Sequence, residues 1–241
     1  MTEVPFADRA EAGRKLAERL SAGRFPENTI VLALPRGGVP VGFAIARRLK
    51  LPLDVLVVRK LGVPWEPELA LGAIAGSTCV LDEPLIGELR IRSEEIERMV
   101  QRERAEIGRR EEIYRGARPP VNVRGRSVIL TDDGVATGNT MLAAARCLRG
   151  LKPAAVTIAV PVGSREACEQ LRTEADDLIC LATPAPFFGV GQWYRDFRQV
   201  ENAEVQDMLA ESDRLLRTAR RSGAWVYGRE EGRSETCGCA T

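Results

Sequence analysis

Residues 128–140 read VILTDDGVATGNT: three apolar residues and a threonine, two adjacent carboxylates, then glycines, small residues and hydroxyls. The apolar run is typical of a buried strand, and Asp132 and Asp133 follow at its end. Two neighbouring carboxylates repel each other and resist the loss of solvent. Something must therefore compensate them, and a metal ion, a sugar bearing hydroxyls or plain solvent exposure would each do so.

A strand–turn–helix pattern repeats on both sides of this stretch. The expected strands cover residues 29–35, 52–58, 127–133, 154–163 and 177–183. The expected helices cover residues 7–22, 37–50, 138–150, 164–175 and 202–220. Strand, Gly-rich turn, helix and strand within about 30 residues form a βαβ unit, which implies parallel strands. The sequence therefore predicts one doubly wound α/β domain with a mainly parallel sheet over residues 1–221.

Two additions and a tail interrupt or follow this pattern. Residues 70–81 read as a hairpin, and a charged helix over residues 93–114 begins at Ser93, its expected N-cap. Its apolar stripe indicates packing by one edge; the stripe consists of Ile96, Met99, Val100, Ile107 and Ile113. We expect a helical insertion over about 82–118, a hood over about 184–200 that is rich in aromatic residues, and a frayed tail at 222–241.

Composition excludes several kinds of chemistry. The 241 residues carry a net charge of +1, so nothing suggests a general nucleic-acid or anionic-membrane binder. There is no histidine, which removes histidine acid–base catalysis and most zinc sites. Four of the six cysteines lie in apolar segments and read as buried thiols, whereas Cys237 and Cys239 form a C-G-C whose role stays open. Without a signal peptide or an apolar membrane span, we expect a cytoplasmic protein.

Three polar or Gly-rich segments follow the expected strands: PRGG at 35–38, RKLG at 59–62 and DDGVATGNT at 132–140. In an open parallel sheet, ligands bind beyond the carboxyl ends of the strands. The last segment is neither a Walker A loop nor a dinucleotide fingerprint, because the required lysine and glycine spacing are missing. A response-regulator receiver would need a later lysine than Lys152, and the chain has none. The exposed amides of this loop, at the start of a helix, suit a phosphate monoester.

Residues 128–140 resemble the phosphoribosyl-diphosphate (PRPP) signature of the type I phosphoribosyltransferases. LPRGG resembles the short pyrophosphate loop of that family, VVRKLG stands where its next basic loop would be, and the likeness covers roughly residues 28–200. It implies an Mg²⁺-dependent transfer of the 5-phosphoribosyl group from PRPP to a nitrogen of a nucleobase-like acceptor, with release of pyrophosphate. Such a reaction passes through an oxocarbenium-like state and relies on charge stabilisation of the leaving group.

The resemblance also assigns roles to residues. Asp132 and Asp133 would hold the ribose hydroxyls directly or through Mg²⁺. Arg36, Arg59 and Lys60 would face the pyrophosphate, assisted by the amides of Gly37 and Gly38. By analogy, the Pro35–Arg36 peptide bond would be cis. The loop that would bind the 5′-phosphate consists of Gly134, Val135, Ala136, Thr137, Gly138, Asn139 and Thr140.

The acceptor is less defined. Ala136 stands where enzymes for 6-oxopurines usually carry Asp, so hypoxanthine and guanine are disfavoured. The hood aromatics would either stack on the acceptor ring or cap the sheet edge; they are Phe187, Phe188, Trp193 and Tyr194. Asp196 would meet a base edge or a metal. A general base would come from Glu111 or Glu112, and residues 109–116 would form a lid or simply a solvated helix end.

Two functions are consistent with this site. The first is the transferase, with PRPP and a small heterocycle as its partners and Mg²⁺ as its cofactor. The second is a PRPP-sensing regulator on the same fold that no longer turns the substrate over. The intact acidic pair and basic loops favour the transferase, since a sensor can lose its contacts to the leaving group. The N-terminal helix and the hood are also compatible with a homodimer.

Overall fold

A computed structural model describes residues 4–221, apart from residues 24, 64, 77 and 117. Its main sheet has the order β2-β1-β6-β7-β8 with every pairing parallel. The strands are β1 (Ile30–Ala33), β2 (Leu53–Val55), β6 (Ser127–Thr131), β7 (Ala155–Val162) and β8 (Asp177–Ala182). The chain winds from β1 outward to β2, returns to β6 and continues the other way, so the topological switch point lies between β1 and β6.

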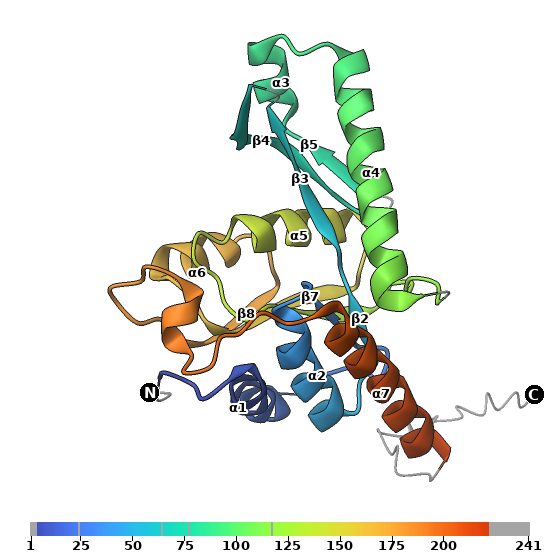
Figure 1. Cartoon of the computed structure of the whole chain (residues 1–241), viewed down its shortest axis with the longest axis vertical. Coiled ribbons are helices and arrows are strands. Elements are labelled where there is room, and N and C mark those ends of the chain that lie inside the picture. Colours follow the sequence, from blue (N-terminus) through green and yellow to red (C-terminus); the bar gives the residue numbers. More distant parts are fainter. Residues whose placement is uncertain (1–3, 24, 64, 77, 117, 222–241) are drawn as a thin grey trace, which may run out of the picture.

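Helices cover both faces of this sheet (Figure 1). One face carries α1 (Arg9–Ser21), α2 (Gly38–Leu49) and α7 (Asn202–Arg221), and the other carries α5 (Asn139–Gly150) and α6 (Arg165–Leu171). Alternate residues of the strands feed the two apolar cores: Val31 and Ala33 face α2, whereas Ile30 and Leu32 face α5. The predicted doubly wound α/β fold is confirmed.

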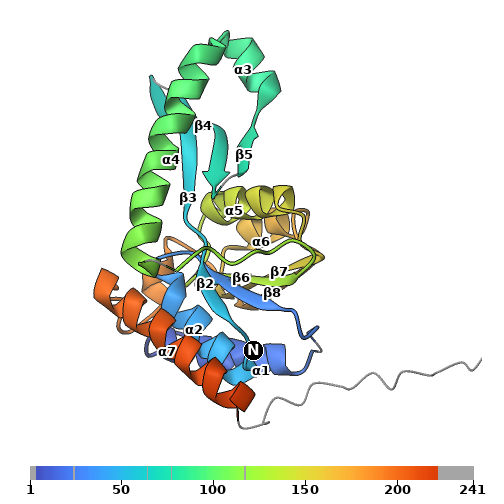
Figure 2. The ribbon, with the colours of Figure 1, turned by 90° about the vertical axis from the view of Figure 1, so that its right-hand side faces the viewer.

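Residues 58–115 form an arm that stands upright on this body (Figures 1 and 2). It consists of the antiparallel strands β3 (Val58–Val63), β4 (Glu66–Ala75) and β5 (Thr78–Leu81) with α3 (Glu83–Leu89) and α4 (Ser93–Arg115). The predicted hairpin is therefore part of a three-stranded sheet. Two details were wrong: Arg59 and Lys60 lie inside β3 rather than in a loop, and Ser93 is the first helical residue, preceded by Arg92 as N-cap.

The apolar stripe of α4 packs against the arm and the body as expected. Ile96 and Ile107 are buried, and Met99, Val100 and Ile113 are partly buried against the same core. Because the stripe is narrow, most of the residues that α4 exposes to solvent are charged or polar, with Ala105 and Gly108 as exceptions.

The lower end of α4 is fastened to the main sheet by a buried ion pair. Arg115 Nε lies 2.7 Å from Asp54 Oδ1, with side-chain exposures of 6% and 8%. The same Asp54 carboxylate accepts from the backbone amides of Val55 at 2.8 Å and Val121 at 3.1 Å. Asp54 lies in β2, so one carboxylate joins the body, the arm and the segment that leads to β6.

Candidate active site

The loops after β1 and β6 leave the sheet side by side at the switch point. Ala33 and Thr131 are paired in register, and the amide of Leu34 donates to the carbonyl of Thr131 at 2.9 Å. The Pro35–Arg36 bond is cis, as expected from the family resemblance. A Cβ at Gly38 would lie 2.8 Å from the Cα of Asp132, and one at Gly37 would fall on the carboxylate of Asp133. Only glycines allow this close approach of the two loops.

The acidic pair is largely withdrawn from water. Burial raises the pKa of Asp132 well above its usual range, and the charge of Asp133 beside it raises that pKa further. Burial also raises the pKa of Asp133, while a hydrogen bond from Arg9 opposes the change. Within the pair, the amide of Asp133 donates to Asp132 Oδ1 at 2.9 Å. The ionised forms of both carboxylates are therefore disfavoured. A bound cation, or hydroxyl groups that donate hydrogen bonds, would stabilise them.

Asp133 is held by two residues that are distant from it in the sequence. Arg9 Nε lies 2.8 Å from Asp133 Oδ2, and the side chains are 10% and 13% exposed. The Tyr194 hydroxyl donates to the backbone carbonyl of Asp133 at 2.5 Å. Burial raises the pKa of Tyr194, so its phenol stays protonated and remains a donor. Arg9 was missed in the sequence because an arginine near the start of a charged helix carries no local signal.

The loop from Gly134 to Gly138 exposes backbone amides at the start of α5. Gly138 has φ +75°, a conformation that favours glycine, and it caps the helix. In the described part of the chain, no group accepts a hydrogen bond from the amides of Ala136, Thr137 or Gly138. The amide of Val135 is different, because it donates to the carbonyl of Val162 at 3.0 Å. The expected contribution of Val135 to phosphate binding through its amide is therefore wrong.

Ser164 holds the loop after β6 in place, and the sequence analysis did not identify this residue. Its hydroxyl donates to the carbonyl of Ala136 at 2.7 Å and accepts from the amide of Ala167 at 3.0 Å as the N-cap of α6. A serine before a helical pattern is a recognisable N-cap signal. Its second contact, to the loop after β6, depends on the tertiary structure.

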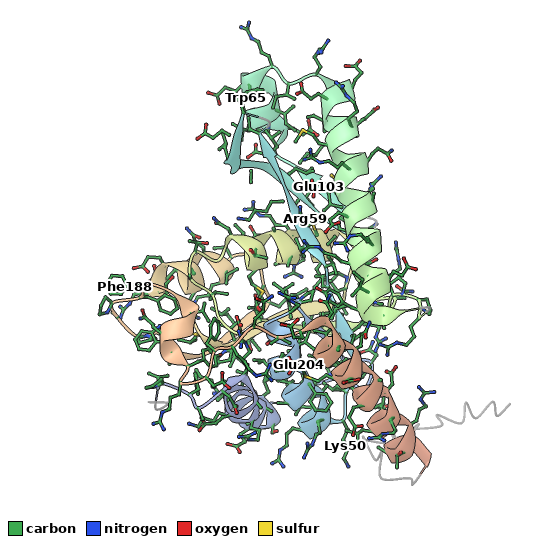
Figure 3. The ribbon with its side chains drawn as sticks, in the orientation of Figure 1. Lys50, Arg59, Trp65, Glu103, Phe188 and Glu204 are labelled. Carbon is green, nitrogen blue, oxygen red and sulfur yellow. The ribbon has the colours of Figure 1, made fainter. Side chains whose placement is uncertain are left out.

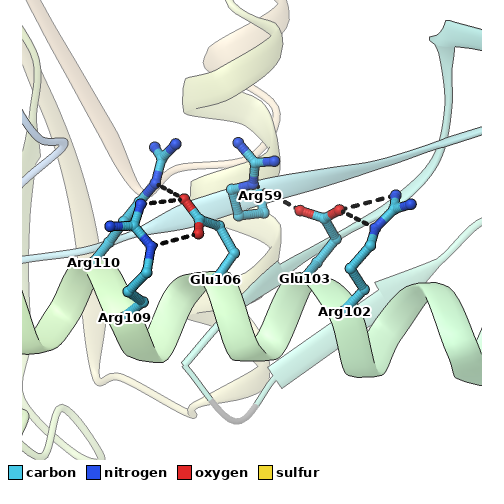
Figure 4. A network of polar contacts seen from close by, with 6 residues as sticks. All are labelled: Arg59, Arg102, Glu103, Glu106, Arg109 and Arg110. Atoms are coloured by element: carbon cyan, nitrogen blue, oxygen red, sulfur yellow. Dashed lines mark hydrogen bonds and ion pairs between the residues drawn. The ribbon is translucent and has the colours of Figure 1, made fainter.

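A cavity of about 450 Å³ rich in arginine adjoins the cis peptide. It is lined by Pro35, Arg36, Arg109, Arg110, Ile113, Tyr114 and Asn202. Glu106 pairs with Arg109 at 2.8 Å and with Arg110 at 2.6 Å, one turn below the cavity (Figure 4). One carboxylate is thus shared by two guanidinium groups, and Arg36 adds a third guanidinium. The excess positive charge makes the cavity attractive to anions. The sequence predicted only that residues 109–116 form either a lid or a solvated helix end, and it did not predict this cavity.

Arg59 and Lys60 do not line this cavity. As neighbours in a strand, they point to opposite sides of β3. Arg59 turns to α4 and pairs with the buried Glu103 at 2.8 Å, which also holds Arg102 (Figures 3 and 4). Lys60 lines a separate cavity of about 430 Å³ between the arm and α5, together with Asn139. The structure therefore brings Lys60 near the loop after β6 and keeps Arg59 in an ion-pair network.

The hood residues divide into buried and exposed groups. Phe188 is 86% exposed and projects from the loop after β8 (Figure 3), whereas Phe187 packs against Trp193 with 5.9 Å between ring centroids. Tyr194 is 6% exposed beneath the acidic pair, so its expected stacking on an acceptor ring is wrong. Trp193 belongs to the short 3-10 helix η1 (Val190–Trp193), and its Nε1 is buried without a hydrogen-bond partner among the described residues.

Asp132 and Asp133 are the two candidate ligands for a metal ion. No group of three acidic or cysteine side chains converges as a metal site within the described ranges, so Asp196 does not join the acidic pair. Its Oδ1 instead accepts from the amide of Arg198 at 3.0 Å. Two hard oxygen ligands are the protein contribution that Mg²⁺ commonly receives when substrate oxygens complete its shell. Asp132 and Asp133 fit that role.

The remaining expectations concern other parts of the chain. Glu111, one proposed general base, lies 2.9 Å from Arg115 Nη1 in an ion pair without hydrogen-bond geometry. Cys79, Cys147, Cys168 and Cys180 are free thiols. Cys237, Cys239 and the whole tail at 222–241 lie outside the described residues. No helix within those residues has the length and apolar character needed to cross a membrane.

Comparison with known proteins supports one family. Residues 7–192 match the family model described as the phosphoribosyl transferase domain. Two relatives named "Putative phosphoribosyl transferase", from Mycobacterium tuberculosis strains CDC 1551 and H37Rv, are each 43% identical over 220 residues. These residues are 91% of this chain and 49% of each relative, so the chain spans about half their length.

A solved structure agrees with this match. The crystal structure of TT1426 from Thermus thermophilus superimposes with a TM-score of 0.77 at 43% identity, over 86% of this chain and 98% of that one. The agreement covers both the sequence and the fold.

Proposed function

The chain belongs to the phosphoribosyl transferase domain family, and from this premise we propose that it transfers the 5-phosphoribosyl group of PRPP to a heterocyclic nitrogen, with release of pyrophosphate. One observation supports this most strongly. At the switch point, a half-buried carboxylate pair lies in the loop that also offers free backbone amides, and the neighbouring loop leads into the arginine cavity. A ribose carrying a phosphate at one end and a diphosphate at the other matches these three environments.

The ribose would bind at the acidic pair. Asp132 and Asp133 would accept hydrogen bonds from its 2′- and 3′-hydroxyls, or hold an Mg²⁺ ion that those hydroxyls also bind. When bound, Mg²⁺ supplies positive charge to the departing diphosphate. Either partner would offset the burial and the charge of Asp133 that together raise the pKa of Asp132. Gly37 and Gly38 keep the opposite loop close enough to cover this part of the substrate.

The two ends of the substrate would meet different donors. Amides of Ala136, Thr137 and Gly138, with the N-terminus of α5 behind them, suit the 5′-phosphate. Lys60 and Asn139 stand beside that loop. Arg36, Arg109 and Arg110 suit the pyrophosphate, because guanidinium groups donate two parallel hydrogen bonds to phosphate oxygens. Arg59 would act through Glu103 by fixing α4 rather than by contact.

Bond cleavage at C1 of the ribose leaves negative charge on the pyrophosphate. The arginine cavity would stabilise that charge more strongly after cleavage than before it, and this difference is what lowers the barrier. Water exclusion by the arm and α4 would protect the oxocarbenium-like state. The acceptor would approach from the side of Phe188, whose ring is exposed to solvent.

A PRPP-sensing role remains the second candidate function. It uses the same pocket to bind PRPP without turnover, and it is separated from the transferase by whether pyrophosphate is released.

The direct test is pyrophosphate release from PRPP with Mg²⁺ across a panel of purine and pyrimidine bases, with a control that lacks a base. Release with one base establishes the transferase and names its acceptor. PRPP binding without any release favours the sensor.

Two variants check the assigned roles. Asp133→Asn should weaken Mg²⁺·PRPP binding without unfolding the chain, and Arg36→Ala should weaken pyrophosphate binding more than ribose 5-phosphate binding. A wild-type protein that binds no PRPP refutes the proposal altogether.

A further inference from the structure

Arg9 is a buried cation that joins three parts of the molecule. It lies at the first position of α1, only 9% of the residue is exposed, and its Nε pairs with Asp133 Oδ2 at 2.8 Å. Its Nη1 donates to the carbonyl of Arg198 at 2.8 Å. Its guanidinium carbon lies 3.9 Å from the centroid of the Phe197 ring. The N-terminal helix, the acidic loop and the segment after the hood therefore meet at one side chain.

This arrangement restricts the position of Arg9 itself. The contact over the Phe197 ring and the hydrogen bond to the carbonyl of Arg198 hold the guanidinium from two further directions. Phe6 adds a backbone link, because its amide donates to the carbonyl of Trp193 and its carbonyl accepts from Arg195, both at 2.8 Å. These contacts leave the Arg9 Nε–H group pointing in one direction, toward Asp133.

The effect on Asp133 is specific to one oxygen. Nε binds Oδ2, which restricts rotation of the Asp133 carboxylate, and no other residue in the described part of the chain donates a hydrogen bond to Oδ1. Tyr194 holds the backbone carbonyl of the same residue at 2.5 Å. Side chain and backbone of Asp133 are thus both fixed by groups that lie under the site rather than in it. A ligand would then find one carboxylate oxygen already oriented.

We propose that Arg9 is a positioning residue that orients Asp133 for the ribose hydroxyls or Mg²⁺ of bound PRPP. The inference rests on the proposed function. Arg9 does not touch the substrate; it neutralises one side of a desolvated carboxylate pair and leaves the other side for the ligand. The N-terminal helix thereby becomes part of the binding site, although it lies 124 residues from Asp133 in the chain.

The test is calorimetric titration of the full chain with PRPP in the presence of Mg²⁺, using Arg9→Gln, Arg9→Lys and the control Arg14→Gln. Arg14 is an exposed arginine of the same helix, so its variant removes the same charge from the same element. Measurements are made well below each variant's unfolding temperature, which is determined separately. Loss of a residue that orients a ligand-binding side chain typically costs 10- to 100-fold in affinity. We expect about a 10-fold or greater loss for Arg9→Gln, a smaller loss for Arg9→Lys and no change for Arg14→Gln.

A double-mutant cycle separates positioning from general stabilisation. If Arg9 acts through Asp133, Arg9→Gln should have little further effect on PRPP affinity in the Asp133→Asn background. A structural role would lower the unfolding temperature equally in both backgrounds and leave the affinity of the folded protein unchanged. Should Arg9→Gln fail to fold, Arg9→Lys with the same cycle decides the question.

The possible results are distinct. Affinity of Arg9→Gln equal to that of Arg14→Gln, or tighter than wild type, overturns the inference while wild-type binding still supports the proposed function. A tighter affinity would mean that Arg9 competes with the ligand for Asp133. Wild-type protein that does not bind PRPP removes the proposed function itself and the inference with it.

Discussion

The ion pair between Asp54 and Arg115 gives the most quantitative prediction. Asp54→Ala removes a carboxylate that accepts from Arg115 Nε, Val55 N and Val121 N. It leaves the Arg115 guanidinium, which is 6% exposed, with Glu111 as its remaining ion-pair partner. Breaking a buried ion pair in this way costs about 3–5 kcal/mol of unfolding free energy. For a domain of this size, 1 kcal/mol corresponds to roughly 2–4 °C, so the melting temperature should fall by about 6–20 °C.

The assay is urea and thermal unfolding followed by circular dichroism, with two comparison variants. Arg149→Ala removes one partner of the exposed pair with Asp176, and it should cost less than about 1 kcal/mol. Asp54→Leu combined with Arg115→Met replaces both buried charges by apolar groups and should recover most of the loss. A loss below about 1 kcal/mol for Asp54→Ala would refute the conclusion that this pair fastens the arm to the sheet. A double variant as unstable as Asp54→Ala would show that packing, not the buried charge of Arg115, sets the cost.

Three further predictions concern the site. Gly38→Ala should cost about 1–3 kcal/mol of unfolding free energy and abolish PRPP binding, because the new Cβ would lie 2.8 and 2.9 Å from backbone atoms. The control is Gly108→Ala in α4, which has open space around it and should stabilise the protein by up to about 1 kcal/mol. The pKa values of Asp132 and Asp133 are raised in the folded protein, so the folded state binds protons more strongly than the unfolded state. Without ligand, the free energy of unfolding should therefore fall as the pH rises from the ordinary pKa range of aspartate through the raised values. Asp132→Asn should flatten that slope and raise the melting temperature at pH 7, and a lower melting temperature would contradict the argument. Arg109→Ala and Arg110→Ala should each weaken pyrophosphate binding by about 10-fold, whereas the control Arg102→Ala, at a residue outside the arginine cavity, should leave it unchanged. If all three variants bind pyrophosphate with equal affinity in a direct binding assay, α4 is not part of the pyrophosphate site.

Local sequence patterns were sufficient for the body of the fold. Apolar runs separated by Gly-rich turns and amphipathic helices determine the order of strands and helices, since burial of these stripes requires a sheet covered on both faces. The acidic pair and the glycines of PRGG and DDGVATGNT were also visible, because a buried carboxylate pair and a tight turn each demand particular residue types. The family resemblance added the cis bond before Arg36, which the structure contains.

Long-range contacts decided the rest. Arg59 and Lys60 are adjacent in sequence, but strand alternation sends one to Glu103 and the other to the cavity beside Asn139. Val135 lost its expected role once its amide paired with Val162. Arg9 looks like any arginine in a surface helix, and only the folding of α1 against the hood places it on Asp133. The sequence by itself determined which residue types could form the site, while the tertiary structure decided which of them meet, because a charge carries no local signal of a partner more than 100 residues away.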